Sequence, residues 1–229
     1  TLSNFMSAML SSTHRKEVTM PNWCETTYKC VGDEEEIKSL HEILQKIDQR
    51  KEPKIPNGFG HLWLGELVTE LGFNWEELRC RGEITGFELC EGVLSIWQET
   101  AWCEQEGVRQ AVEKKYPSVK VYYLEEEPGC EIYCTNDLEG TYFPDNYYLD
   151  TYDDPQYFET IEQAAKYVGG LVGHEVKENV GSIKKALDDY AEIRQENDED
   201  VFYCFHWLYL FVRQIYYIFF IQSQILPIN

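Results

Sequence analysis

Residues 20–33, MPNWCETTYKCVGD, join a β-strand pattern to the start of a helix. From Asn22 to Val31 the side chains alternate as they do in a strand with one buried face. The face that we expect to be buried carries Cys24, Thr26, Tyr28 and Cys30. The opposite face carries Trp23, Glu25, Thr27 and Lys29. These residues predict the first strand of a sheet that is covered on one side.

A helix is predicted to follow this strand directly. Gly32 and Asp33 turn the chain, and Asp33 is the expected N-cap. Glu36, at the third helical position, would complete a capping box with Asp33. Apolar residues then recur at helical spacing and form one stripe: Ile37, Leu40, Leu44 and Ile47.

The chain up to residue 135 continues with helices and strands in a recognisable order. We expect a loop at 51–60, a short helix at 61–71, two strands within 79–102, a helix at 104–116, and strands at 119–123 and 130–134. The order is β-α-(insert)-β-β-α-β-β. It predicts an α+β fold, a ferredoxin-like split βαβ sheet with helices on one face and an extra edge strand.

Two appended C-terminal helices are expected beyond an aromatic and acidic stretch that follows Asn136. Thr160 and Gln163 predict the start of the first helix, and Gly169-Gly170 predicts its end. Ser182 predicts the start of the second. Its expected inward-facing residues are Ile183, Leu187, Tyr190 and Ile193. We expect this pair to pack on, or beside, the first unit.

Three segments divide the chain. Residues 1–19 are expected to be a disordered leader ahead of a native start at Met20, and residues 20–200 to be the α+β domain. Residues 201–229 are a hydrophobic aromatic tail. Residues 201–226 are long enough to span a bilayer, although Arg213 lies near their centre. Three interpretations stay open: a membrane anchor, a buried or partner-packed helix, and sequence that is not native coding sequence.

Charge limits the choice of partner. The chain has 41 acidic and 20 basic residues, a net charge of −21. This charge argues against direct nucleic-acid binding, which needs a basic surface. A basic protein partner is compatible with it. The excess is greatest from Glu125 to Asp200, with 21 acidic and 5 basic residues, and Asp150, Asp153 and Asp154 are the expected acidic partner surface.

Catalytic and metal-binding patterns are missing from the sequence. Eight cysteines occur without a C-x-x-C spacing, so we expect free thiols in the core and a cytoplasmic location. No H-E-x-x-H or G-x-S-x-G pattern is present. We therefore predict no catalytic residue, no metal and no cofactor.

One segment could still bind a small ligand. Trp97, Thr100 and Trp102 lie where a predicted strand passes into a helix, so backbone amides at the helix start would point toward a ligand. His61, beside a glycine-containing loop, is the histidine that best fits a functional role. The alternative is an aromatic plug that covers the end of the sheet.

Several short motifs resemble the YubB-like proteins, uncharacterised proteins of phages, plasmids and bacterial mobile elements. They are Pro21-Asn-Trp-Cys24, Trp97-x-x-Thr100-x-Trp102, Lys115-Tyr-Pro117 and Glu126-Glu-Pro-Gly129. The resemblance covers roughly residues 20–195 and implies a ferredoxin-like domain and a mobile-element context. It implies no activity, catalytic residue or cofactor. This chain departs from the pattern in the insertion-rich stretch at 51–78 and in the Cys-Glu-Gln that follows Trp102.

The sequence thus predicts a non-catalytic acidic interaction protein of mobile-element origin, which engages a basic, DNA-handling host protein. Two alternatives remain open. One is an enzyme or small-ligand-binding protein with a site near Trp97, Thr100 and Trp102. The other is a domain tethered to a membrane through residues 201–226.

Overall fold

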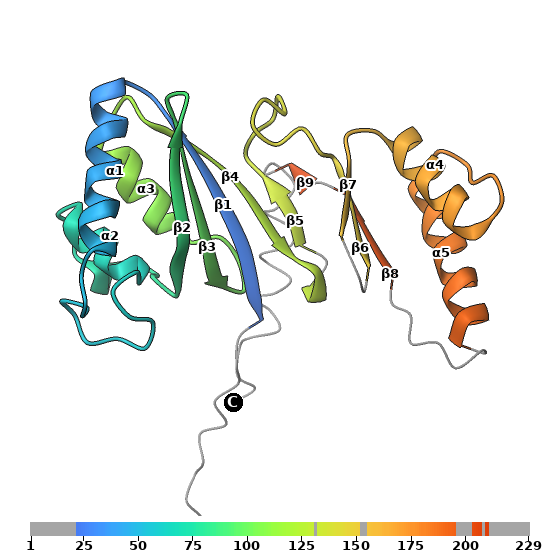
Figure 1. The fold of residues 1–229 in the computed structure, drawn as a ribbon, viewed down its shortest axis with the longest axis horizontal. Helices are drawn as coiled ribbons and strands as arrows, with labels where there is room; N and C mark the ends of the chain where they lie inside the picture. The colour runs from blue at the N-terminus through green and yellow to red at the C-terminus, as the bar shows by residue number, and fades with distance from the viewer. Residues whose placement is uncertain (1–21, 131, 152–154, 196–202, 208, 211–229) are drawn as a thin grey trace, which may run out of the picture.

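A computed structural model describes residues 22–130, 132–151, 155–195, 203–207 and 209–210. The chain forms an α+β protein with a main sheet, a small sheet and helices packed on each (Figure 1). The strands are β1 (Trp23–Val31), β2 (Gly82–Cys90), β3 (Val93–Ala101), β4 (Lys120–Glu127), β5 (Ile132–Thr135), β6 (Tyr147–Thr151), β7 (Gln156–Phe158), β8 (Tyr203–Trp207) and β9 (Tyr209–Leu210). The α-helices are α1 (Glu34–Asp48), α2 (Leu64–Glu70), α3 (Glu106–Lys115), α4 (Ile161–Val172) and α5 (Val180–Gln195). Short 3₁₀ turns cover Trp75–Glu77 and Pro128–Cys130.

The main sheet has the strand order β2-β3-β1-β4-β5-β9. Its first five strands pair antiparallel, and β9 runs parallel to β5. Helices α1, α2 and α3 cover one side of this sheet (Figure 1). We call that side the helix face and the opposite side the outer face. The predicted element order up to β5, including the extra strand after β4, is confirmed.

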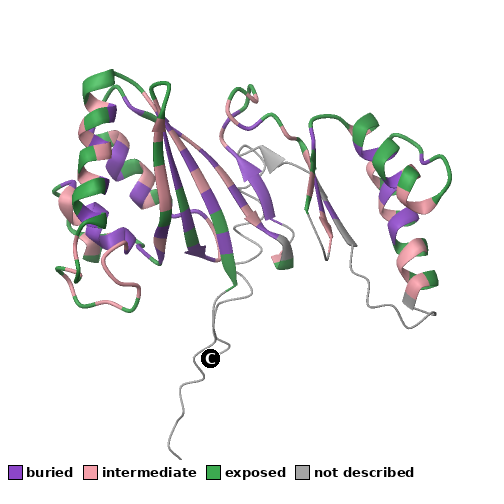
Figure 2. Cartoon of the chain, viewed as in Figure 1, coloured by how far each residue is buried: buried purple, intermediate pink, exposed green. Residues whose placement is uncertain are grey.

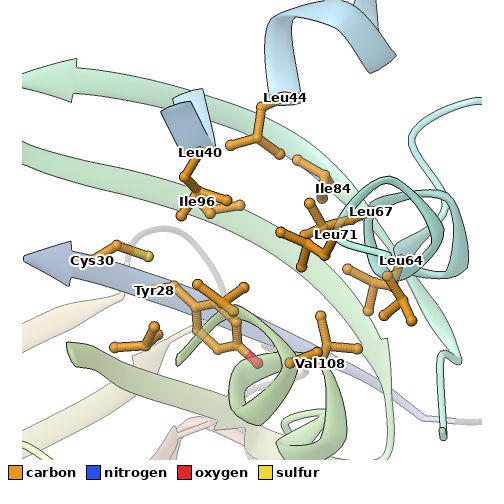
Figure 3. Packing of buried hydrophobic residues seen from close by; sticks show 14 of the residues in the cluster. Tyr28, Cys30, Leu40, Leu44, Leu64, Leu67, Leu71, Ile84, Ile96 and Val108 are labelled. Atoms are coloured by element: carbon orange, nitrogen blue, oxygen red, sulfur yellow. The ribbon is translucent and has the colours of Figure 1, made fainter. Parts of the chain in front are cut away.

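The main hydrophobic core lies between the helix face and these helices. Leu40 and Leu44 of α1 lie above Ile96 and Ile84 of the sheet (Figure 3). The predicted α1 stripe is confirmed, since all four of its residues are almost completely buried. The predicted inward face of β1 is confirmed as well, because Cys24, Thr26, Tyr28 and Cys30 are all at most 1% exposed.

The start of α1 differs from the prediction in one respect. The Asp33 side chain caps the helix by accepting a hydrogen bond from the Glu35 amide at 3.0 Å. The capping box is wrong, because the Glu36 carboxylate instead accepts hydrogen bonds from the amide and hydroxyl of Ser118, at 3.0 and 2.6 Å. A Cβ at Gly32 would lie 2.8 Å from the Ser118 carbonyl oxygen. The first turn of α1 is therefore tied to the turn that precedes β4.

Ion pairs hold the insert between α1 and β2 against the first helix. Arg50 donates to the carboxylates of Glu66 and Glu70 at 2.8 and 2.6 Å. Glu66 is completely buried and also accepts the Ile55 amide at 2.8 Å. Burial raises the pKa of Glu70, but hydrogen bonds from Lys46, Lys54 and Arg50 outweigh it and lower that pKa to about 2. These contacts order a loop that the sequence describes only as rich in proline and glycine.

The small sheet has the order β7-β6-β8, and α4 and α5 pack together against it. Buried residues of all these elements form a second core (Figure 2). They include Leu149, Phe158, Ala164, Val168, Ile183, Leu187 and Phe205. The pairing of α4 with α5 is confirmed, whereas the sequence did not predict the small sheet as such.

The tail contributes strands to both sheets. Residues 203–207 form β8, which pairs with β6, and residues 209–210 form β9, which pairs with β5. The interpretation of these residues as a helix is wrong, because their backbone groups pair with neighbouring strands. In the part of the chain that the structure describes, no helix is long and apolar enough to cross a membrane. Residues 211–226 of the proposed anchor, like the leader 1–19, lie outside the described residues.

The bounds of the two C-terminal helices also differ from the prediction. The capping box of Thr160 and Gln163 is confirmed. The helix α4 passes through Gly169-Gly170, however, and ends at Gly173, whose φ of +80° is the left-handed cap that glycine favours. The Asn179 side chain accepts the Ser182 amide, so α5 begins earlier, at Val180. Ile193, which was predicted to face inward, is 59% exposed.

Candidate functional site

Four glutamates line up across the outer face of the main sheet. Strand pairing places Glu83 opposite Glu99, Glu99 opposite Glu25, and Glu25 opposite Glu126. We call these four residues the glutamate row. Adjacent strands lie about 4.8 Å apart, so the row extends about 14 Å from β2 through β3 and β1 to β4.

The row is electrostatically unfavourable in the folded chain. Like charges directly opposite each other on antiparallel strands are destabilising. Within the described residues, no lysine or arginine forms an ion pair with any member of the row. Burial and the nearby charge of Glu99 raise the pKa of Glu83. In the part of the chain that the structure describes, the carboxylates of the row therefore lack a cation paired with them.

Glu126, at the β4 end of the row, is the most enclosed of the four. Its carboxylate accepts a hydrogen bond from the Tyr157 hydroxyl at 3.0 Å. Burial raises the pKa of Glu126 to about 7; the Tyr157 bond opposes the rise, and the charges of Glu25 and Asp145 add to it. Near neutral pH, Glu126 is therefore protonated in a substantial fraction of the molecules.

One tryptophan lies on each side of the row, Trp97 on one side and Trp23 on the other. Trp97 precedes Glu99 by two residues and Trp23 precedes Glu25 by two, so each lies about 6.6 Å along its strand from that carboxylate position. Trp97 is 39% exposed and Trp23 is 43% exposed. A Cβ at Gly86, opposite Trp97, would lie 3.3 Å from the indole ring. Glycine at this position therefore avoids a tight contact with the ring.

The small sheet packs against the β4 end of the row and leaves Glu25 and Glu99 exposed. The Tyr133 ring of β5 stacks on Tyr148 of β6, with centroids 5.7 Å apart, and its hydroxyl donates to the Asp145 carbonyl at 3.0 Å. Tyr157 reaches Glu126, as described above. On the other side, Glu25, Glu99, Trp23 and Trp97 remain exposed. The outer face of β2, β3 and β1 is therefore accessible.

The structure separates the four residues that were predicted to bind a ligand. Trp97 lies on the outer face, whereas Thr100 is completely buried on the helix face, where its hydroxyl is hydrogen-bonded to that of Thr26 at 3.0 Å. His61 lies in the loop before α2, with its Nε2 4.0 Å from an Asp48 carboxylate oxygen. Trp97 and Thr100 point to opposite faces because they are three positions apart on one strand, where successive side chains alternate between the two faces.

Trp102 follows β3 in a left-handed conformation with φ of +73°. Its amide donates to the Asn22 carbonyl at 2.9 Å. One amide next to it is occupied from within the chain, because the Glu104 amide donates to the Glu125 carboxylate at 2.5 Å.

A buried polar cluster lies beneath this segment on the helix face. Glu104 accepts hydrogen bonds from the Tyr28 hydroxyl at 2.6 Å and from Arg109 Nε at 3.0 Å. Burial raises the pKa of Glu104, although Arg109 and Tyr28 favour its charged form. Gln98, 3% exposed, has no hydrogen-bond partner within the described residues for either atom of its amide. Glu104 is thus hydrogen-bonded from within the chain, whereas the Gln98 amide and Glu127 Oε2 have no partner among the described residues.

Several cysteines among the described residues have raised thiol pKa values. Burial raises the pKa of the Cys24, Cys30 and Cys134 thiols above their usual range, and that of Cys103 to about 11. Thiols with raised pKa values are poor nucleophiles at neutral pH. Among the described residues, no group of cysteine, histidine, aspartate and glutamate side chains has the geometry to hold a metal ion.

The acidic surface predicted near residue 150 is described only in part. Asp150 lies on β6 opposite Cys204 of β8 and hydrogen-bonds to Tyr148. Asp153 and Asp154 lie outside the described residues. That surface stays a prediction.

A hollow of about 560 Å³ lies between α4 and the segment that follows it. Its polar lining consists of Glu162, Lys166, His174, Glu175 and Glu178. All five side chains are exposed, whereas small-molecule sites bury most of the surface of their ligand. The hollow does not have the character of an active site.

Sequence reasoning alone did not find the glutamate row. The alternation in β1 had placed Trp23 and Glu25 on the outer face, but alignment with Glu83, Glu99 and Glu126 depends on the strand register. Comparisons with known protein families, curated proteins and solved structures returned no significant match. The fold and site thus define an α+β protein with an open, carboxylate-lined sheet face.

Proposed function

We propose that the protein is a non-catalytic interaction protein that binds a basic partner protein through the outer face of β2, β3 and β1. The observation that carries this proposal is the glutamate row with an exposed tryptophan on either side. The repulsion between these carboxylates is relieved when a partner supplies cations, which favours binding. Tryptophan adds apolar contact area and cation–π attraction, and it is enriched at binding hot spots.

The charge of the chain supports the same partner class. With a net charge of −21, long-range attraction favours basic proteins and disfavours nucleic acid. Charged patches of this kind act mainly on the association rate and on partner choice. A basic, DNA-handling host protein meets these requirements.

We further propose a ferredoxin-like architecture for the first unit. Support comes from the β2-β3-β1-β4 strand order and from the crossovers through α1 and α3 on one face. Together with the motifs around Pro21 and Trp97, this order is compatible with a YubB-like protein of mobile-element origin that acts in the cytoplasm. The function would then belong to the open outer face, because a fold by itself does not determine activity and the site on it does.

The proposal is tested by titrating the full-length chain with a small basic nucleoid protein at low and moderate salt. Replacing Glu25 and Glu99 together by glutamine should weaken binding about tenfold, because two exposed ion pairs are lost. A control variant with Glu42→Gln and Glu192→Gln makes the same change in net charge on exposed positions of α1 and α5. It should weaken binding less than about twofold.

Two outcomes would contradict the proposal. If no binding is measured even at low salt, the protein is not an acidic interaction protein of this kind. If both double variants weaken binding equally, attraction depends on total charge and not on the outer face. Tighter binding to an oligonucleotide than to the basic protein would also contradict it.

A further inference from the structure

The glutamate row has a direction as well as a charge. Its four carboxylates are directly opposite one another on adjacent strands, so the row runs across the strands and not along any one of them. Neighbouring positions are about 4.8 Å apart. At this spacing the four carboxylates extend over about 14 Å. They are too far apart to coordinate one metal ion together, but the row is long enough to bind several separate cations.

The row has defined ends. At β4 it is bounded by Tyr157, whose hydroxyl donates to Glu126. At the other end Glu83 lies on β2, the outermost strand of the main sheet on that side. A ligand that matches the row therefore needs charge over about 14 Å and little beyond it.

An extended peptide segment meets this requirement. Successive residues of an extended chain advance about 3.3 Å, and every second side chain points to the same side. Basic side chains at positions i, i+2 and i+4 thus cover about 13 Å on one face of the segment. That length matches the row, whereas three consecutive basic residues would present at most two side chains to it.

Trp97 favours arginine in such a segment. A guanidinium paired with Glu99 would lie next to the exposed indole, which is about 6.6 Å away along β3. Arginine combines bidentate pairing to a carboxylate with stacking on an aromatic ring, and lysine does so less well. The side chain best placed to bind Glu99 is therefore arginine.

Resting on the proposed function, we infer that the partner docks through an extended segment with arginine or lysine at alternate positions. This segment lies across β2, β3, β1 and β4 along the glutamate row, with one arginine beside Trp97. Its contacts are made by side chains, because the backbone groups of β3, β1 and β4 already pair with strands on both sides.

The test uses two peptides of identical composition and the full-length chain. One peptide, Gly-Arg-Gly-Arg-Gly-Arg-Gly, has alternating arginines; the other, Gly-Gly-Arg-Arg-Arg-Gly-Gly, has them adjacent. Calorimetric titration at about 20 mM salt keeps screening low. The alternating peptide should bind about two- to fivefold more tightly, since it adds one ion pair.

Matched protein variants locate the contact. Glu99→Gln should remove the preference for the alternating peptide. Glu88→Gln should keep it, because Glu88 is an exposed outer-face residue opposite Ser95 and outside the row. Trp97→Leu should weaken binding of the alternating peptide about two- to fivefold through loss of the cation–π contact. Circular dichroism confirms that each variant is folded.

The outcomes separate this inference from the proposed function. Equal affinity for the two peptides, or equal effects of Glu99→Gln and Glu88→Gln, overturns the docking geometry. If the basic protein still loses binding in the Glu25/Glu99 double variant, the proposed function stands without it. If neither peptide nor the basic protein binds at low salt, both proposals fail.

Discussion

Neutralising Glu99 should stabilise the free protein. Glu99 faces two exposed or partly exposed carboxylates of the glutamate row, Glu25 on β1 and Glu83 on β2. At a separation of about 5.5 Å, two unit charges repel by about 0.8 kcal/mol in a water-like medium. Each pair lies within the range of about 0.2–1 kcal/mol typical of cross-strand pairs, and the two together give about 1.5 kcal/mol.

Thermal unfolding of Glu99→Gln checks this value. For a chain of this size, about 1.5 kcal/mol corresponds to a rise in Tm of roughly 3 to 6 °C at pH 8 and low salt. At about 1 M salt, where the Debye length is about 3 Å, most of the rise should disappear. Urea unfolding at the same pH gives an independent measure of the free energy of unfolding.

The control is Glu88→Gln, which removes a charge from the outer face where the opposite residue is Ser95. Its Tm should change by less than about 1 °C. A decrease in Tm for Glu99→Gln, or an equal increase for Glu88→Gln, would refute the reasoning. An increase that is insensitive to salt would refute its electrostatic cause.

Three further predictions concern Glu126, Gly65 and Gln98. The folded state holds the Glu126 proton up to about pH 7, whereas the unfolded chain releases it at about pH 4.3, so the stabilisation from this proton is complete below about pH 4 and is lost as the pH rises through 7. Between pH 5 and 8, the Glu126→Gln variant should therefore become more stable relative to the parent protein in urea titrations. Parallel pH profiles of the two proteins would disprove this prediction. Gly65→Ala should lower Tm, because the new Cβ would collide with the Trp63 ring. Gly170→Ala in α4 should raise Tm, because its Cβ meets no atom within 4 Å. The reverse ranking in a melting experiment would contradict the packing argument. Gln98→Met should stabilise the protein by about 1 to 2 kcal/mol, because it removes a buried amide that has no hydrogen-bond partner among the described residues. A loss of stability would show that the amide is hydrogen-bonded in solution.

The local patterns in the sequence are sufficient to predict most of the helices, strands and buried faces of the first unit. Alternation gave the inward face of β1, and the spacing of Ile37, Leu40, Leu44 and Ile47 gave the inward stripe of α1. Both are short-range properties that depend on strand and helix geometry alone. The incorrect prediction of a capping box shows the limit of local patterns. Glu36 instead accepts a hydrogen bond from Ser118, which is distant in sequence.

Long-range pairing explains what the sequence could not supply. The small sheet needs β8, whose aromatic residues look like a membrane or core helix when considered as a hydrophobic run. Similarly, each glutamate of the row looks like an ordinary solvent-facing residue within its own strand. Only the register across four strands brings them together.

The placement of β8 and β9 has a consequence for synthesis on the ribosome. Strands β1 to β5 are complete once Thr135 has emerged, but the small sheet needs Tyr203–Trp207 to cover the edge of β6. At about 5–20 residues per second, β6 waits roughly 3 to 10 s for its partner. An uncovered strand edge invites pairing with other chains. The dense negative charge from Glu125 to Asp200 surrounds β6 during this delay, so it would keep nascent chains apart until the fold closes.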